Sequence, residues 1–128
     1  MTEHPIAVAV RRSFEAWNSG RVEVVSEYLT EDVVLHFAGN NAMSGTYRGR
    51  NAVIDALARA SRGWGAHSQV ESVLASDDHV MVFHHVTGEQ QRGLYEESVI
   101  AYKLDADGKV TEGWFLANDQ RGFDKFWS

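Results

Sequence analysis

Apolar residues near the start of the chain recur at the spacing of a helix. They lie four, four and three residues apart: Ile6, Val10, Phe14 and Trp17. This spacing puts them on one face and predicts a helix over residues 4–18. Asn18-Ser19-Gly20 breaks the pattern, and a shorter apolar pattern over 22–30 predicts a second helix that forms a hairpin with the first.

The middle of the chain changes from strand to helix. Residues 33–37 are a β-branched and aromatic run of strand length. A short extended piece is expected at 44–47. Apolar positions at helical spacing follow over 53–61, and Gly63 is expected to end that helix.

Every segment after residue 67 has the pattern of a strand. The expected strands are 69–75, 79–87, 94–104 and 109–118. Turn residues at 76–78 and 105–108 make two hairpins of them. The second of these strands is apolar at both alternating positions, which predicts a sheet covered on both faces. With a short aromatic tail after them, these elements predict one α+β domain over residues 1–128.

The composition excludes several classes of function and of site. The net charge of −6 argues against binding to a nucleic-acid backbone. The chain has no cysteine, which excludes a disulfide, a thiolate nucleophile and a cysteine-ligated zinc. The first residues have neither the pattern of a signal peptide nor that of a membrane span, so we expect a cytoplasmic protein. Without a Gly-rich phosphate loop or metal-ligand spacing, we expect neither a cofactor nor a metal.

The order of elements and several local phrases resemble the NTF2-like superfamily. The phrases are residues 14–20, 29–34, 43–49 and 107–114. The last of them, with the aromatic ending, resembles SnoaL-like, ketosteroid-isomerase-like members. The resemblance implies a cystatin-like cone, in which three N-terminal helices pack on a curved, mixed and mainly antiparallel sheet around a conical pocket. This fold hosts isomerases, cyclases, hydrolases, dehydratases and proteins without catalysis.

The residues that ketosteroid isomerases use are replaced in this chain. Carried over one at a time, their oxyanion tyrosine falls at Ser13, their base aspartate at Phe37 and their protonated aspartate at Ile100. Their reaction needs a carboxylate base and two acidic donors. The resemblance therefore implies a pocket, but not that mechanism.

Two neighbouring histidines interrupt the apolar strand at 79–87. His84 and His85 point to opposite faces of the sheet, so one of them faces the pocket. Counted from the Asp77-Asp78 turn, the inward residues are Met81, Phe83 and His85. The outward residues are Val80, Val82 and His84. A slip of one residue exchanges the two sets. We predict His85 as a catalytic base, because an imidazole titrates near neutral pH.

Three further residues are candidates for acid–base chemistry. His36 is a possible base, although alternation puts Phe37 on the pocket side and His36 opposite it; a structural histidine with a hydrogen-bond partner is the alternative. Asp119 follows the last strand in an aromatic setting and is either an acid–base group or a cap for the tail. Glu96 shares the alternation of Ile100 and is either an acid–base group or solvated.

The resemblance also implies which residues line the pocket. The matching positions are Ser13, Trp17, Phe37, Leu57, Ser61, Met81, Phe83, His85, Ile100 and Tyr102. On the last strand, Trp114 and Asn118 share one face and Phe115 and Ala117 the other. The pattern does not decide which face is inside, and we include Trp114 and Asn118 as candidates. Trp17 is either a stacking wall or core, and Tyr102 either a phenolic donor or core.

Two functions fit these residues. The first is a cofactor-independent acid–base enzyme of the SnoaL-like type that acts on a small, mainly apolar carbonyl or polycyclic compound, as an isomerase, cyclase, hydrolase or dehydratase. The alternative is a noncatalytic protein of the same fold that binds a hydrophobic ligand or a partner. A largely apolar lining fits a small hydrophobic molecule and disfavours sugars and phosphates.

The pattern also predicts an assembly. Apolar residues are expected on the sheet face that the helices leave open: Val80, Val82, Val86, Val99 and Ala101. Such a patch is unfavourable in water, and NTF2-like proteins commonly pair through that face. We therefore expect a two-fold homodimer.

Overall fold

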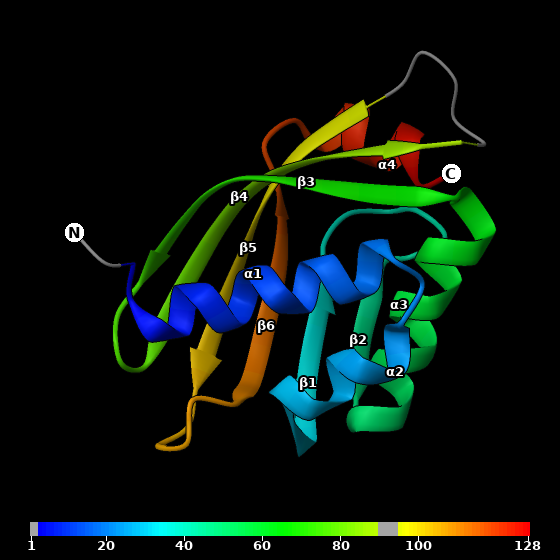
Figure 1. Ribbon diagram of the computed structural model, residues 1–128. Coiled ribbons are helices and arrows are strands. Elements are labelled where there is room, and N and C mark those ends of the chain that lie inside the picture. Colours follow the sequence, from blue (N-terminus) through cyan, green and yellow to red (C-terminus); the bar gives the residue numbers. More distant parts are fainter. Residues whose placement is uncertain (1–2, 90–94) are drawn as a thin grey trace.

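Helices cover one face of a mixed sheet in this protein (Figure 1). The structure, a computed structural model, describes residues 3–89 and 95–128, the first two residues of the second segment by their backbone alone. The elements in chain order are α1 (Pro5–Asn18), α2 (Val22–Val25), η1 (Ser26–Tyr28), β1 (Leu29–Phe37), β2 (Gly45–Arg48), α3 (Arg50–Trp64), β3 (Ala66–Ala75), β4 (His79–Gly88), β5 (Tyr95–Leu104), β6 (Val110–Ala117) and α4 (Gln120–Phe126).

The strands of the described chain form one sheet in the order β2-β1-β6-β5-β4-β3. β1 and β6 are parallel, and all other neighbours are antiparallel. Figure 1 shows α1 crossing in front of the sheet, with α2 and α3 on the same side. The predicted α+β fold, with a mixed and mainly antiparallel sheet, is therefore confirmed.

Two predicted boundaries are wrong. The second helix was expected to reach residue 30, but only one α-helical and one 3₁₀ turn form, and Leu29 already belongs to β1 because it pairs with Val110 of β6. The third helix passes Gly63 and ends after Trp64, where Gly65 has a left-handed φ of 60° and caps the helix. Leu94, the predicted first residue of the third long strand, lies outside the described residues.

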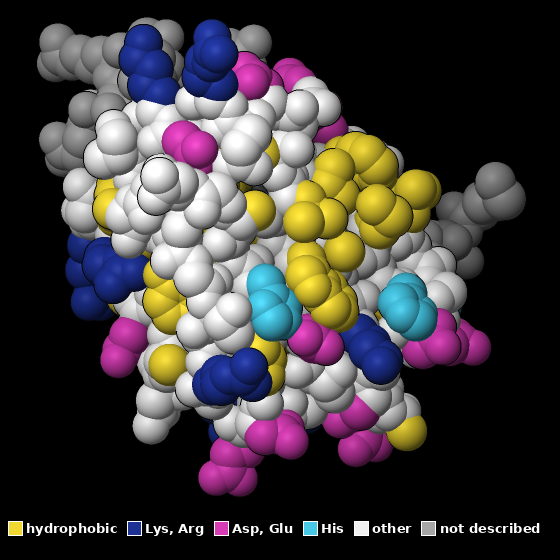
Figure 2. All heavy atoms as spheres, turned by 180° about the vertical axis from the view of Figure 1, so that it is seen from behind, with side chains coloured by type: hydrophobic (Ala, Val, Ile, Leu, Met, Phe, Trp, Pro, Cys, Tyr) yellow, Lys and Arg dark blue, Asp and Glu magenta, His cyan; other side chains and the backbone are white. Residues whose placement is uncertain are grey.

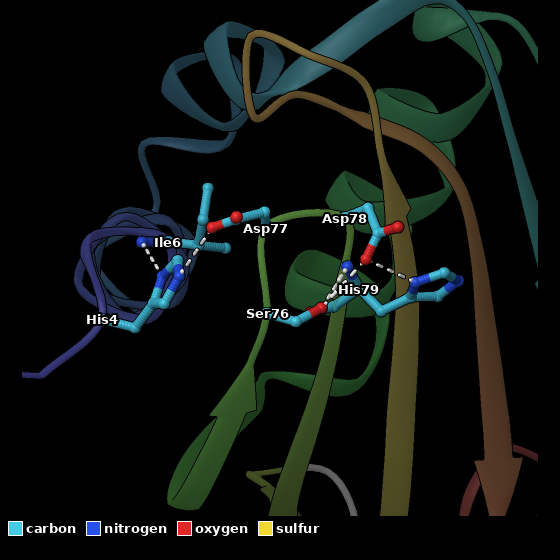
Figure 3. A network of polar contacts seen from close by, with 6 residues as sticks. All are labelled: His4, Ile6, Ser76, Asp77, Asp78 and His79. Carbon is cyan, nitrogen blue, oxygen red and sulfur yellow. Dashed lines mark hydrogen bonds and ion pairs between the residues drawn. The ribbon is translucent and has the colours of Figure 1, made fainter.

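The start of α1 is joined to the turn between β3 and β4 (Figure 3). His4 precedes Pro5, and its Nδ1 accepts a hydrogen bond from the backbone N–H of Ile6 at 3.1 Å. Its Nε2 lies 3.2 Å from the Asp77 carboxylate in the turn. These two contacts cap the helix and hold its first turn against the strand hairpin that forms one side of the core.

Two buried hydrophobic clusters lie between the sheet and the helices. One gathers around Phe37 and the tail residues Phe123, Phe126 and Trp127. The other is built from positions on several strands and on α1 and α3, among them Val33, Val82 and Ile100. In the described part of the chain, no helix is long and apolar enough to cross a membrane.

Candidate functional site

A cavity lies between the helices and the inner face of the sheet. Its volume is about 60 Å³, several times the roughly 10–15 Å³ that one water molecule needs. The helices contribute Ser13, Phe14, Trp17, Val25, Ala56, Leu57 and Ala60 to its wall. The remaining wall residues are Leu35, Phe37, Met43, Ser68, His84, Val86, Ile100, Tyr102, Phe115 and Trp127.

A second cavity of about 40 Å³ adjoins the first. The two share six wall residues: Ser13, Val25, Leu35, Leu57, Tyr102 and Phe115. Beyond these, the second wall is mainly aliphatic, with Ile6, Val33 and Leu104 among its members. Neither wall contains an Asp, Glu, Lys or Arg among the described residues.

Six of the residues predicted to line the pocket lie in the cavity wall. They are Ser13, Trp17, Phe37, Leu57, Ile100 and Tyr102. Ser61 does not line either cavity, because the inward stripe of α3 runs through Ala56, Leu57 and Ala60 instead. Trp17 is fixed as a wall residue, since its indole N–H donates to the backbone oxygen of Leu57 at 2.9 Å.

The predicted orientation of β4 is wrong. The residues that face the helices and are buried are Val80, Val82, His84 and Val86. Met81 and Phe83 are 41% and 37% exposed on the opposite face. His85 lies on that outer face too, where its Nδ1 is 2.8 Å from the carboxylate of Glu71. His85 therefore cannot be a cavity base.

Both alternating sets of β4 are apolar, which is why hydrophobicity did not fix its orientation. The neighbouring strand β5 contains a residue that indicates the orientation of β4. Ser98 shares the alternation of Ile100 and pairs with His84 in the β4–β5 register. A buried imidazole needs a hydrogen-bond partner, and a serine directly opposite supplies one.

His84 forms a polar row across three strands. Ser68 Oγ on β3 lies 2.5 Å from His84 Nδ1, and Ser98 Oγ on β5 lies 2.7 Å from His84 Nε2. All three side chains are buried. Asn18 at the end of α1 exchanges two hydrogen bonds with the backbone of Ser68, at 2.7 and 2.9 Å, so this row is also tied to the helix layer.

Burial lowers the pKa of His84 to about 4; the neighbouring His85 adds to the lowering, and Glu71 opposes it. The imidazole is therefore neutral at pH 7, with one ring nitrogen donating to a serine and the other accepting from a serine. The edge of this ring also contacts Phe14, with the ring centroids 5.7 Å apart. His84 is held on both sides and is a weak base.

His36 lies on the outer face, opposite Phe37 as alternation indicated. Its Nε2 is 2.6 Å from the Glu112 carboxylate and its Nδ1 is 3.1 Å from the Thr46 hydroxyl. The ring stacks on Trp114 with centroids 5.6 Å apart. His36 thus has the partners of a structural histidine and no access to the cavity, so the prediction that it is a catalytic base is not supported by its position.

The last strand turns Phe115 inward and Trp114 outward. In the β5–β6 register Ile100 pairs with Phe115 and Tyr102 with Gly113, which places Phe115 in the cavity wall. Trp114 and Asn118 therefore do not line the cavity, contrary to their inclusion as candidates. The exposed Asn118 side chain donates to Glu97 at 3.2 Å.

Asp119 stands at the N-cap position of α4 and is exposed. Its backbone oxygen accepts from the N–H of Phe123 at 2.9 Å, while its side chain makes no capping hydrogen bond. It does not reach the cavity, and its position at the helix start agrees with the structural alternative. The side chain of Glu96 lies outside the described residues, although its backbone pairs with Val86.

The other wall residues were not among the predicted ones: Phe14, Val25, Leu35, Met43, Ala56, Ala60, Ser68, His84, Val86, Phe115 and Trp127. Met43 precedes β2 and Trp127 ends the tail, and neither belongs to a regular pattern from which a facing direction can be read. Within residues 3–89 and 95–128, no group of three or more His, Asp or Glu side chains is placed to hold a metal ion.

Comparison with known proteins agrees with this architecture. A family model described as a SnoaL-like domain matches residues 10–113. No curated protein sequence matches the chain. Among solved structures, Bal32a from a soil-derived mobile gene cassette is 28% identical, with a TM-score of 0.86 over 96% of each chain.

Two other solved structures have the same architecture. A protein of unknown function with a cystatin-like fold from Xanthomonas campestris is 25% identical, with a TM-score of 0.79 over 95% of this chain and 98% of that one. RV0760c from Mycobacterium tuberculosis, whose structure contains estradiol-17β-hemisuccinate, is 17% identical, with a TM-score of 0.77 over 91% of this chain and 95% of that one.

Proposed function

The chain belongs to the SnoaL-like domain family and has its NTF2-like, cystatin-like fold, and from this premise we propose that it binds a small, mainly apolar molecule in its cavity without transforming it. The observation that carries the proposal is the state of the polar groups in the wall. Both ring nitrogens of His84 are bonded to serines, the Ser13 hydroxyl donates to the Val10 oxygen at 2.6 Å, and the Trp17 indole donates to Leu57.

Acid–base catalysis needs a group that is aimed at the substrate and titrates near the working pH. The pKa of His84 is about 4, and its nitrogens are already engaged. No carboxylate belongs to the described part of the wall. These features support binding over the acid–base enzyme that the sequence also suggested.

The wall defines the ligand class. Because it is mainly aliphatic and aromatic, a sugar or phosphate would lose its water without gaining partners. The absence of Lys and Arg from the described wall disfavours a buried anionic group in the same way. The cavity of about 60 Å³ is narrow, so a ligand of steroid size, such as the one in RV0760c, requires side chains of the wall to move.

The test is calorimetric titration with naphthalene, with glucose 6-phosphate as the polar control ligand. We expect naphthalene to bind and the sugar phosphate not to bind. Two matched variants of α3 locate the site: Ala60→Leu fills the cavity wall, whereas Ala52→Leu lies outside both walls. Naphthalene binding should weaken at least tenfold in the first variant and stay unchanged in the second.

Chemical conversion of a bound carbonyl compound would overturn the proposal. Turnover that disappears in His84→Gln would assign His84 as the base. Turnover that disappears in Glu96→Gln would assign the carboxylate at 96 instead. Absence of naphthalene binding to the wild-type protein would also contradict the proposal.

We further propose a homodimer through the outer face of the sheet. In the described chain, the exposed large hydrophobic side chains are Leu74, Met81, Phe83 and Leu116, and all four belong to this face. Figure 2 shows hydrophobic side chains gathered into a continuous patch on it, with a histidine on either side. Apolar patches of this kind are characteristic of protein interfaces.

The composition of that face differs from the sequence prediction. Val80, Val82 and Val86 are buried under the helices, because β4 has the opposite orientation, whereas Val99 and Ala101 are on the outer face as expected. Sedimentation equilibrium at micromolar concentration should give twice the chain mass of 14.3 kDa. A mass of one chain would contradict the dimer and leave the ligand proposal unaffected.

A further inference from the structure

Tyr102 carries a hydroxyl that the fold leaves available inside the cavity. This residue lines both cavities, and its hydroxyl has no hydrogen-bond partner among the described residues. The indole N–H of Trp127 also lacks a partner, but that nitrogen is itself enclosed by other atoms. The Tyr102 oxygen is not among these enclosed atoms, so it keeps accessible surface, and the residue that carries it lines both cavities.

Gly113 leaves the space that the Tyr102 ring occupies. The two residues pair across β5 and β6. A Cβ atom on Gly113 would lie 2.9 Å from Cδ1 of Tyr102, closer than real Cβ atoms come, and 3.1 Å from Cε1. The ring thus occupies the space that a side chain at position 113 would need, next to Leu35 on β1. Glycine weakens a strand interior, and here it makes room for one side chain.

The phenol stays protonated under all ordinary conditions. Burial raises the pKa of Tyr102 far above its usual value. A protonated phenol donates one hydrogen bond and is uncharged. An acceptor oxygen on a neutral ligand can therefore satisfy it, since an isolated buried hydroxyl is costly when it has no partner.

Tyr102 lines both cavities, so a ligand oxygen bonded to it would lie between two apolar parts of the ligand. The larger cavity is bounded by aromatic residues such as Phe37 and Trp127, and the smaller one by aliphatic residues such as Val33 and Leu104. A molecule whose oxygen meets Tyr102 can extend an apolar group into each of them. A charged carboxylate in that place would find no cation in the described walls.

On the basis of the proposed binding function, we infer that Tyr102 is the hydrogen-bond donor that orients the ligand. The ligand class is an elongated, neutral molecule with one acceptor oxygen, of the ketone or ether kind, between two apolar groups. Gly113 is a positioning residue, because it fixes where the hydroxyl lies without meeting the ligand oxygen.

The test uses two probes with the same skeleton. Valerophenone carries a ketone between a phenyl ring and a butyl chain, and pentylbenzene has a methylene in place of the ketone. Calorimetry measures both Kd values for the wild type and for Tyr102→Phe. Loss of the hydroxyl should weaken valerophenone about fivefold, the value of one neutral hydrogen bond, and leave pentylbenzene unchanged or bound more tightly.

Two further variants separate the roles. Tyr28→Phe removes a hydroxyl from a residue that lines only the smaller cavity, and it should affect the two probes equally. Gly113→Ala keeps the Tyr102 hydroxyl but displaces its ring, and it should lower the preference for valerophenone as Tyr102→Phe does. Infrared spectra of bound valerophenone give a readout in the wild type itself, where we expect the carbonyl band at lower wavenumber than in hexane.

The outcomes distinguish the two proposals. If neither probe binds the wild type, the binding function fails. If both bind, but Tyr102→Phe changes them by the same factor and the carbonyl band is unshifted, the binding function stands and the role of Tyr102 is overturned. A ketone-specific loss in Tyr28→Phe, with none in Tyr102→Phe, would likewise overturn it.

Discussion

His84 and His85 are neighbours in the chain but meet opposite environments. His84 is 5% exposed, faces the helices and contacts two serines. His85 is on the outer face and contacts a carboxylate, that of Glu71. The same side chain is thus a neutral element of a buried polar row in one position and a partner for an acid in the next. The chemistry of each histidine follows from its side of the sheet rather than from its type.

The contrast extends to the whole sheet. Outer-face histidines contact carboxylates, as His36 does with Glu112 at 2.6 Å. Inner-face polar groups pair with neutral hydroxyls or backbone atoms, except the Tyr102 hydroxyl, which has no partner in the described chain. A cavity kept free of charge in its described wall is suited to apolar ligands, and an outer face with both signs of charge around an apolar patch is suited to a second copy of itself.

The largest effect is expected from placing a charge on each face of β5. Ile100 is 1% exposed in the inner core, whereas its neighbour Val99 is on the outer face. Ile100→Asp buries an unpaired carboxylate and should lower the free energy of unfolding by about 4 kcal/mol or more, or prevent folding. Val99→Asp should leave the monomer folded and separate the dimer. Urea denaturation and sedimentation measure the two effects.

A reversed result would contradict the described faces. If Val99→Asp unfolds the chain and Ile100→Asp merely dissociates it, β5 has the opposite orientation. If Val99→Asp leaves the dimer intact, the outer face is not the interface.

The histidine pair gives the next effect. In His84→Leu the hydroxyl of Ser68 loses its ring partner inside the core, and we expect the free energy of unfolding at pH 7 to fall by about 2–4 kcal/mol. His85→Leu acts at a partly exposed side chain and should change this free energy by less than about 1 kcal/mol. Urea denaturation of both variants checks this, and equal losses would remove the distinction between the two positions.

The sequence was sufficient for the element order and for six residues of the cavity wall. The family resemblance implied Trp17, Leu57 and Ile100 as lining residues, and the alternation of β5 puts Tyr102 on the same face as Ile100. Val99 and Ala101 make the other alternation of β5 apolar as well, so its hydrophobic pattern alone does not fix which face is buried.

The orientation of β4 needed information from its neighbours. Valines occupy one alternation and Met81 and Phe83 the other, so either orientation buries apolar surface. The buried row from Ser68 to Ser98 decides between them, and it becomes visible only when three strands are aligned. The sequence indicated Tyr102 as a possible donor. The space that Gly113 leaves for its ring could not be predicted, because it depends on the β5–β6 register.

The pH dependence of stability sharpens the comparison further. The pKa of His84 falls from 6.5 to about 4 on folding. At pH values between these two pKa values, His84 is protonated in the unfolded chain but not in the folded chain. Stability is therefore lost as the pH falls from about 6.5 toward 4. Between pH 7 and pH 5 this group should cost about 2 kcal/mol of unfolding free energy.

His84→Gln removes this titration, and His85→Gln is its control on the other face. Unfolding free energies are measured by urea denaturation at pH 7 and pH 5. The difference between the two pH values should be about 2 kcal/mol smaller in His84→Gln than in the wild type. His85→Gln should retain most of the wild-type difference, although His85 and Glu71 both influence the pKa of His84. An unchanged pH dependence in His84→Gln would show that His84 is not buried in the neutral form.

The smallest effect is expected for the ion pair of the outer face. His36 and Glu112 form a short contact, but their side chains are 32% and 36% exposed. Partly exposed pairs are worth roughly 0–1 kcal/mol, because solvent screens them and both side chains lose freedom. A double-mutant cycle of His36→Gln and Glu112→Gln, measured by urea denaturation at pH 6, should give a coupling below about 1 kcal/mol that shrinks further in 1 M NaCl. The Thr46 contact and the stacking on Trp114 are unaffected by salt and remain in Glu112→Gln, so the ring should keep its place in that variant. A coupling as large as the loss in His84→Leu would mean that the outer face is as well shielded from water as the inner one. The dimer would produce this shielding if it covered His36. Repeating the cycle in the monomeric Val99→Asp protein would then reduce the coupling to below about 1 kcal/mol.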